Sequence, residues 1–318
     1  MKAYVSTDPF GSISKEPVNL LKYNGFDYRC NEFGRKITSE ELAGDIGDAD
    51  VLIAGTENIT REVFEKAPNL KLISRVGIGL DGIDFDLCKE YGVRVAYTPD
   101  APTIAVAELT VGLMLDCGRK VTETNNNLKV HDIWRRHMGM LLNGRTVGLM
   151  GLGRIGKTLV HLLGGFNVKF IAHDHNPDIA FSKLYNINLT SKVDVLKYSD
   201  IVSIHLPLTE RTRDYITYED LTLMQEHAIL INTARGGIVN EDDLCRALEA
   251  REIAGAAVDV FYEEPYDGCL KSYDNCILTC HMGASTTSSR VDMEVQAVQE
   301  AIRFSQGKPL KNEVFENV

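Results

Sequence analysis

The sequence has no long apolar run. None of its hydrophobic stretches approaches the roughly 18 residues that a membrane-spanning helix needs, and the N-terminus, MKAYVSTDPF, lacks the apolar region of a signal peptide. It also has no long basic run, and its formal net charge is −11. We therefore expect neither a membrane protein nor a protein whose main partner is nucleic acid or an anionic membrane surface.

Cysteine pairs with metal-binding or redox spacing are absent as well. The seven cysteines are an odd number, and no two form a C-x-x-C motif. This pattern favours free thiols in a reducing cytosol over a disulfide framework or a zinc site, so we expect a cytoplasmic protein without a bound metal. Cys280, next to His281, is expected to be a small buried hydrophobic residue.

Short runs rich in Val and Ile are present throughout the 318 residues, with helical periodicity between them. Apolar runs of four to eight residues are typical of parallel strands that are buried on both faces. The expected strands are 2–7, 50–55, 70–77, 93–99, 146–151, 168–174, 200–208, 228–236, 253–261 and 276–281. A helix should follow Gly153, because Ile155, Leu159, Leu162, Leu163 and Phe166 form an apolar stripe, and a helix at 240–250 should be capped by Asn240.

The alternation of strands and helices predicts two α/β domains with parallel sheets. The segment 98–119 begins with two prolines and becomes a long helix, which suits a crossing from one sheet to the next. A C-terminal helix at about 287–306 could return to the first domain. We therefore predict a discontinuous substrate domain, 1–98 with 287–318, and an inserted dinucleotide-binding domain, 99–286.

The stretch GLGRIG (151–156) carries the clearest cofactor signal. Gly151, Gly153 and Gly156 fit the G-x-G-x-x-G pattern, follow an apolar strand, and open a periodic helix. An acid, Asp174, ends the next expected strand, where it would bind the adenosine ribose and repel a 2′-phosphate. The sequence therefore predicts a Rossmann domain that binds NAD rather than NADP, with pyrophosphate at the N-terminus of the helix.

Three further side chains follow predicted strands at the edge where α/β sheets place ligands. Arg235 lies in NTARGG, Glu264 in DVFYEEP and His281 in TCHMGAS. Each could have an ordinary role, as a solvated turn residue, a loop carboxylate and a hydrogen-bonded core imidazole. Their occurrence together, behind a cofactor-binding domain, favours a catalytic site.

With these motifs, the sequence resembles the D-isomer-specific 2-hydroxyacid dehydrogenases, most closely their 3-phosphoglycerate dehydrogenase branch. The resemblance covers nearly the whole chain, and its motifs include SRVGIGLDGID (74–84), VAELTVGLML (106–115), HLPLTERTR (205–213), NTARGGIVNEDDL (232–244) and HMGAST (281–286). It implies two doubly wound parallel-sheet domains: an inserted Rossmann NAD-binding domain and a flavodoxin-like discontinuous substrate domain.

The resemblance also implies a role for each matching residue. His281 is the acid/base, Glu264 hydrogen-bonds and orients its imidazole, Arg235 holds the substrate carboxylate or carbonyl, and Asp259 binds the carboxamide of the nicotinamide. The other implied NAD-binding residues are Thr103, Arg154, Ile155, His205, Leu206, Pro207, Thr212, Thr233, Ala234, His281 itself and Gly283. The implied substrate-binding residues are Arg75, Val76, Gly77, Ile78, Arg235 and Arg136, with the N–H groups of 76–78 around the substrate carboxylate.

Some positions depart from the family pattern. Pro102 stands where the family usually has an Asn that reaches the active site, and Cys280 replaces a usual Pro. By resemblance, residues 120–145 look like the segment that links two subunits, which implies a homodimer or a dimer-based tetramer. Arg75, Arg135 and Arg136 could bind a substrate phosphate, or could be an ordinary solvated basic cluster. No serine-binding regulatory domain is expected after residue 318.

Several functions therefore stay open at this point. The leading hypothesis is an NAD-dependent enzyme that interconverts 3-phosphoglycerate and 3-phosphohydroxypyruvate. A hydroxypyruvate or glyoxylate reductase, or a dehydrogenase of another phosphorus-containing 2-hydroxy acid, is the alternative within the family. An NAD-sensing corepressor on the same scaffold is the alternative of a different class.

Overall fold

The computed structural model describes residues 1–315 as two compact units. The first unit contains Met1–Pro102 and the residues from Ser285 onward, and the second contains Thr103–Ala284. The sequence had placed these two crossings after residues 98 and 286. The last three residues of the expected substrate domain, 316–318, lie outside the described residues. Among the described residues, no helix combines the length and apolar composition needed to cross a bilayer.

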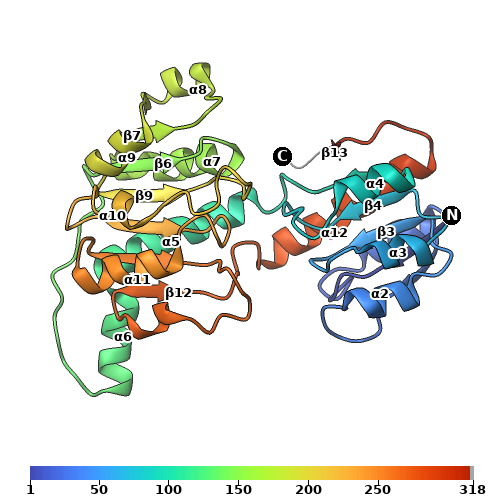
Figure 1. The fold of residues 1–318 in the computed structure, drawn as a ribbon, viewed down its shortest axis with the longest axis horizontal. Coiled ribbons are helices and arrows are strands. Elements are labelled where there is room, and N and C mark those ends of the chain that lie inside the picture. Colours follow the sequence, from blue (N-terminus) through green and yellow to red (C-terminus); the bar gives the residue numbers. More distant parts are fainter. Residues whose placement is uncertain (316–318) are drawn as a thin grey trace. The chain divides into compact units, whose positions relative to one another are not determined.

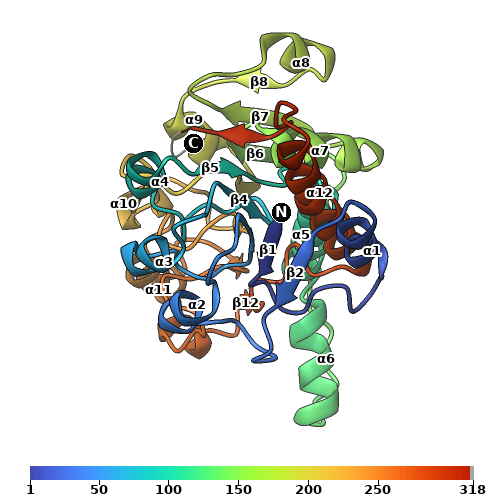
Figure 2. The same cartoon turned by 90° about the vertical axis from the view of Figure 1, so that its right-hand side faces the viewer.

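The first unit is a six-stranded sheet between two layers of helices. Its strand order is β13-β5-β4-β3-β1-β2, in which β1 to β5 are parallel in the flavodoxin-like order and β13 is antiparallel. Figure 2 shows α1 and α12 on one side of these strands and α2, α3 and α4 on the other. The strands are β1 (Lys2–Val5), β2 (Asp27–Cys30), β3 (Val51–Ala54), β4 (Leu72–Arg75), β5 (Arg94–Ala96) and β13 (Glu313–Val314). The helices are α1 (Glu16–Tyr23), α2 (Ser39–Asp45), α3 (Arg61–Lys66), α4 (Phe85–Tyr91) and α12 (Thr287–Ser305).

The second unit is a seven-stranded parallel sheet, again covered on both faces. The strand order β12-β11-β10-β9-β6-β7-β8 is the Rossmann order with one added strand, and the order reverses between β6 and β9. Helices α5 and α7 pack on one face, and α9, α10 and α11 pack on the other (Figure 1). The strands are β6 (Thr146–Met150), β7 (Lys169–His173), β8 (Asn188–Leu189), β9 (Ile201–Ile204), β10 (Ile229–Asn232), β11 (Gly255–Val258) and β12 (Cys276–Leu278). The helices are α5 (Thr103–Arg119), α6 (Val121–Val130), α7 (Arg154–Leu163), α8 (Ile179–Leu184), α9 (Lys192–Tyr198), α10 (Tyr218–Leu221) and α11 (Glu241–Ala250), with short 3₁₀ turns η1 (Gly164–Phe166) and η2 (Cys269–Ser272).

Local sequence explains the ends of several elements. The Asn240 side chain accepts a hydrogen bond from the Asp243 N–H at 3.0 Å and caps α11, as its sequence predicts. The predicted apolar stripe on α7 was wrong at one position, because Leu162 is exposed and Val160 is buried instead. Position 160 faces the sheet because it follows the buried Gly156 by four residues, about one helical turn.

The cysteine prediction needs two corrections. Cys245 in α11 and Cys269 in η2 form a disulfide across 24 residues, so these two are not free thiols. Spacing could not reveal this pair, because the two cysteines come from elements that meet only in the folded domain. Cys280 is exposed, not buried, because it follows the end of β12 in the loop that carries His281.

Helix α6 projects from its own unit in both ribbon views (Figures 1 and 2). None of its residues is buried. The helix and the loop after it, residues 121–141, expose an unusual set of large apolar side chains: Val121, Leu128, Val130, Ile133, Trp134, Met138 and Leu141. We call residues 121–141 the arm. Exposed apolar side chains at this density are typical of an interaction surface.

Candidate active site

The turn between β6 and α7 fits the phosphates of a dinucleotide. Gly151 has a φ of +101°, and a Cβ there would lie 2.5 Å from the carbonyl oxygen of His205. A Cβ at Gly156 would lie 2.5 Å from the Gly151 carbonyl oxygen, so both positions require glycine. A Cβ at Gly153 would meet no atom within 4 Å, which leaves the outer side of the turn open. The first N–H groups of α7, those of Arg154 and Ile155 among them, lie at this open side.

Asp174 follows β7 and lies beside this turn. Its carboxylate accepts hydrogen bonds from the Leu152 N–H at 2.7 Å and the Asn176 N–H at 2.8 Å. These bonds hold the carboxylate at the end of β7, where the ribose of a dinucleotide is bound in this fold. Because no arginine follows Asp174, the residues suit NAD better than NADP.

Most of the other residues that the family resemblance assigns to the cofactor lie on loops at the carboxyl ends of the same parallel strands. His205, Leu206 and Pro207 follow β9, and the Thr212 hydroxyl closes their loop by donating to the Pro207 carbonyl at 2.6 Å. Thr233 and Ala234 follow β10, and the hydroxyls of Thr233 and Thr110 lie 2.8 Å apart. Thr103 begins α5, and Gly283 lies in the loop after β12.

His281 and Glu264 are in direct contact. The Nδ1 atom of His281 lies 2.8 Å and 3.0 Å from the two carboxylate oxygens of Glu264. The carboxylate can only accept, so Nδ1 carries the proton in this bond and Nε2 is the atom that can exchange a proton. The side chains are 48% and 39% exposed, so the pair is accessible to a small molecule.

The loop that carries His281 is held by Asp259, at the end of β11. The Asp259 carboxylate accepts hydrogen bonds from the Thr279 hydroxyl at 2.6 Å, the Met282 N–H at 2.8 Å and the Gly283 N–H at 2.9 Å. The His281 N–H donates to the Asp259 carbonyl at 2.8 Å. His281 has a φ of +49°, an uncommon conformation for a non-glycine residue, and these bonds hold it there. Sequence reasoning did not identify Thr279, because a threonine after a strand carries no distinctive signal.

Arg235 lies on the loop after β10, which packs against the segment that carries Glu264. The Asn232 side chain shapes this loop by donating to the Arg235 carbonyl at 3.0 Å and accepting from the Ala234 N–H at 3.1 Å. A Cβ at Gly236 would lie only 1.9 Å from the Phe261 carbonyl oxygen, so the two segments touch backbone to backbone. Loops bearing Arg235, Glu264 and His281 therefore converge at the carboxyl edge of one sheet.

The expected substrate-binding turn lies in the other unit, after β4. Arg75 is buried, and its guanidinium donates to the carbonyls of Val76 and, at 2.9 Å, Gly79. The Val76 N–H donates to the Ala54 carbonyl at 2.9 Å, and the Gly77 N–H donates to the Thr98 hydroxyl at 2.7 Å. The Gly77 N–H also donates to the Arg75 carbonyl at 3.1 Å. For these two N–H groups to bind a substrate carboxylate together with that of Ile78, the bonds to Ala54, Thr98 and Arg75 would have to open.

Comparison with known proteins decides the family. Residues 111–283 match the profile of the D-isomer-specific 2-hydroxyacid dehydrogenase NAD-binding domain. The chain belongs to this family. The match spans the glycine turn, Asp174 and the loops of Arg235, Glu264 and His281, so the second unit is the NAD-binding domain of a 2-hydroxyacid dehydrogenase.

Relatives within the dehydrogenase family are named for different substrates. A D-3-phosphoglycerate dehydrogenase from Methanocaldococcus jannaschii is 40% identical over 90% of this chain and 55% of its own length. A glyoxylate reductase from Thermofilum pendens is 39% identical over 96% of this chain and 92% of its own length. The crystal structure of the TT0316 protein from Thermus thermophilus has a TM-score of 0.89 at 30% identity, and covers 99% of this chain and 100% of that chain. The chain thus spans about half the length of the phosphoglycerate dehydrogenase that it matches.

Proposed function

We propose that the protein catalyses hydride transfer between a D-2-hydroxy acid and NAD, with His281 as the acid/base. The observation that carries the proposal is the 2.8 Å contact between His281 Nδ1 and Glu264, at the edge of an NAD-binding domain. The dinucleotide, when bound, supplies the hydride acceptor. Nε2 of His281 takes the hydroxyl proton as the carbinol carbon loses its hydride, and returns it in the reverse reaction.

The neighbouring side chains position the reactants. Glu264 fixes the imidazole so that Nε2 points away from the carboxylate, and it stabilises the positive charge that the ring gains with the proton. Arg235 offers a planar guanidinium that can bind the substrate carboxylate or carbonyl with two hydrogen bonds. We propose that Asp259 binds the nicotinamide carboxamide in addition to holding the loop of His281.

We propose 3-phosphoglycerate as the substrate. A 40% identical phosphoglycerate dehydrogenase supports this choice, and the exposed cations Arg135 and Arg136 could bind a phosphate. Reduction of glyoxylate or hydroxypyruvate is the second candidate, because a glyoxylate reductase is 39% identical over 92% of its own length. Pro102 and Cys280, which depart from the family pattern, favour neither candidate.

A substrate panel tests these assignments. The purified protein is assayed with NAD and 3-phosphoglycerate, and with NADH and hydroxypyruvate or glyoxylate. We expect the highest kcat/KM with 3-phosphoglycerate, and a raised KM for that substrate alone in Arg136→Ala. A higher kcat/KM with glyoxylate would select the second candidate, and NAD binding without turnover of any acid would favour the corepressor.

We also propose a homodimer, or a tetramer built from dimers, that pairs through the arm. The exposed side chains of Trp134 and Met138, 80% and 95% accessible, support a partner on this segment. The mass of the protein in solution, measured by sedimentation, tests this directly. A cytoplasmic location stays a prediction, although the disulfide removes one of the reasons for it.

A further inference from the structure

The segment between β11 and η2 carries Glu264 and is itself held in place. The Phe261 N–H donates to a Glu264 carboxylate oxygen at 3.2 Å, so a backbone group of the same segment orients the carboxylate. The Phe261 and Tyr266 rings stack with centroids 4.0 Å apart, on either side of Glu264 in the sequence. The direction of the carboxylate therefore depends on where residues 261–266 lie.

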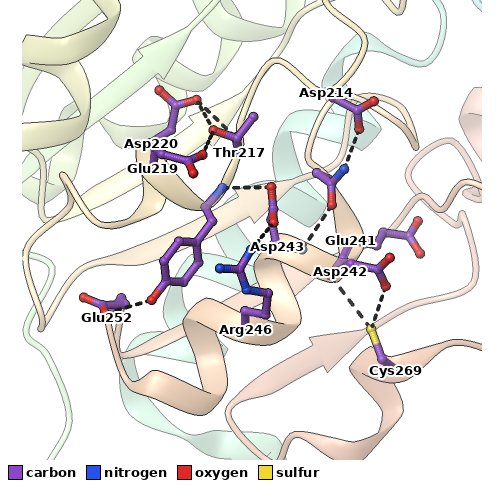
Figure 3. A network of polar contacts seen from close by, with 12 residues as sticks. Asp214, Thr217, Glu219, Asp220, Glu241, Asp242, Asp243, Arg246, Glu252 and Cys269 are labelled. Carbon is purple, nitrogen blue, oxygen red and sulfur yellow. Dashed lines mark hydrogen bonds and ion pairs between the residues drawn. The ribbon is translucent and has the colours of Figure 1, made fainter.

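Tyr262 links this segment to two other elements. Its hydroxyl donates to the Asp214 carboxylate, and its N–H donates to the Glu241 carboxylate at 2.6 Å. Glu241 is the first residue of α11, whereas Asp214 lies on the loop before α10. Figure 3 shows the Asp214 and Glu241 carboxylates near the beginning of α11.

Asp214 is a fixed acceptor. The same oxygen that accepts from Tyr262 also accepts from the Asn240 side chain at 3.0 Å, and the Asp214 N–H donates to the Gly237 carbonyl at 2.8 Å. Asn240 is in turn the cap of α11. Tyr262 is therefore tied to the framework of the domain and not to another mobile side chain.

The Tyr262 ring also contacts the loop of Arg235. A Cβ at Gly237 would lie 3.1 Å from a ring carbon of Tyr262, so the ring rests on the backbone of that loop. Burial, followed by the hydrogen bond to Asp214, raises the pKa of the Tyr262 phenol to about 12, so the hydroxyl stays a donor throughout the neutral pH range. Tyr262 thus connects the segment of Glu264 with the loop of Arg235.

From these contacts we infer that Tyr262 is a positioning residue for catalysis: through Asp214 it holds Glu264 where it orients the His281 imidazole. The inference rests on the proposed acid/base role of His281. A tyrosine that only stabilised the domain would change its melting temperature, but would leave the catalytic rate of the folded enzyme unchanged.

The test removes only the hydroxyl. Tyr262→Phe keeps the ring on Gly237, and we expect kcat to fall roughly tenfold, because small displacements of catalytic groups have large effects on rate. KM and the affinity for NAD should stay within about twofold of wild type. Tyr218→Phe is the matched control, because the Tyr218 hydroxyl donates to Glu252 at 3.2 Å in the same domain but lies outside the segment of Glu264.

Variants of the acceptor give a second, independent arm. Asp214→Asn keeps an oxygen that can accept from Tyr262 and should retain most of kcat, whereas Asp214→Ala should lose at least as much as Tyr262→Phe, because it also removes the acceptor of the Asn240 side chain. The double variant Tyr262→Phe, Asp214→Ala should have the kcat of Asp214→Ala alone, since the Tyr262 hydroxyl no longer contributes once its acceptor is removed. If Tyr262→Phe does not fold, the comparison of Asp214→Asn with Asp214→Ala carries the test.

His281→Ala, measured in parallel, separates the inference from the proposed function. If His281→Ala loses turnover while Tyr262→Phe has the wild-type kcat, the inference is overturned and the proposed function stands. A fall in kcat that is equal in Tyr218→Phe, or a change confined to KM for NAD, also overturns it. Wild-type turnover in His281→Ala would overturn both.

Discussion

A partly buried imidazole should make the NAD-binding domain sensitive to acid. His205 follows β9, and its Nε2 lies 2.9 Å from the Ser203 hydroxyl. Its Nδ1 is buried and has no hydrogen-bond partner among the described residues. Burial lowers the pKa of His205 from 6.5 to about 4, because a charge at this position would lose its hydration.

The sign and size of the effect follow from the two pKa values. Above pH 6.5 His205 is neutral in both states and does not change the free energy of unfolding. Between pH 6.5 and 4 the unfolded chain binds the proton and the folded chain does not, so stability falls as the pH falls. At about 1.4 kcal/mol for each pH unit, the loss at pH 4.5 relative to pH 8 is about 2.5 kcal/mol.

The assay compares wild type with His205→Gln, which keeps a polar group near Ser203 but does not titrate. Urea unfolding of the cofactor-free protein, followed by circular dichroism, gives the free energy of unfolding at pH 8 and pH 4.5. The wild type should lose about 2.5 kcal/mol more than the variant over this range, because the other titrating groups are common to both. Equal losses in the two proteins would refute the assignment of an imidazole that stays neutral in the folded domain.

Two more perturbations address the packing around the site. Replacing Cys245 and Cys269 with serine removes a cross-link across 24 residues. The double variant should have a free energy of unfolding about 3.5 kcal/mol lower than wild type under oxidising conditions. A double variant as stable as wild type in urea would contradict the disulfide. Gly236→Ala places a Cβ 1.9 Å from the Phe261 carbonyl oxygen. The variant should therefore lower the free energy of unfolding by about 1–3 kcal/mol and reduce kcat. An unchanged melting temperature and kcat would show that the loop of Arg235 and the segment of Glu264 can separate freely.

The fold could be predicted from the sequence where its strands are buried. All ten predicted strands exist, because central parallel strands such as β6 and β9 carry continuous apolar runs. The sequence missed β2, β8 and β13, which lie at the edges of the sheets. Edge strands are covered less completely, and β8 and β13 have only two residues each, so no apolar run marks them.

The site could be predicted from the sequence only in part. The glycine turn after β6 could be expected from its motif, and the loops of Glu264 and His281 could be expected at one edge because they follow parallel strands. The contact between these two side chains was expected only from the family resemblance. The disulfide and the bond from Tyr262 to Asp214 could not, since each joins residues from separate elements at a distance that no local pattern encodes. Likewise, the N–H bonds of Val76 and Gly77 depend on neighbours from β3 and from residues after β5.

The most direct test of the proposed chemistry is kcat of His281→Ala beside its dissociation constant for NAD. We expect a dissociation constant close to that of wild type and a kcat lowered by about 10²–10⁴-fold, the usual contribution of an acid/base group. A variant that binds NAD normally and turns over at nearly the wild-type rate would exclude His281 as the acid/base.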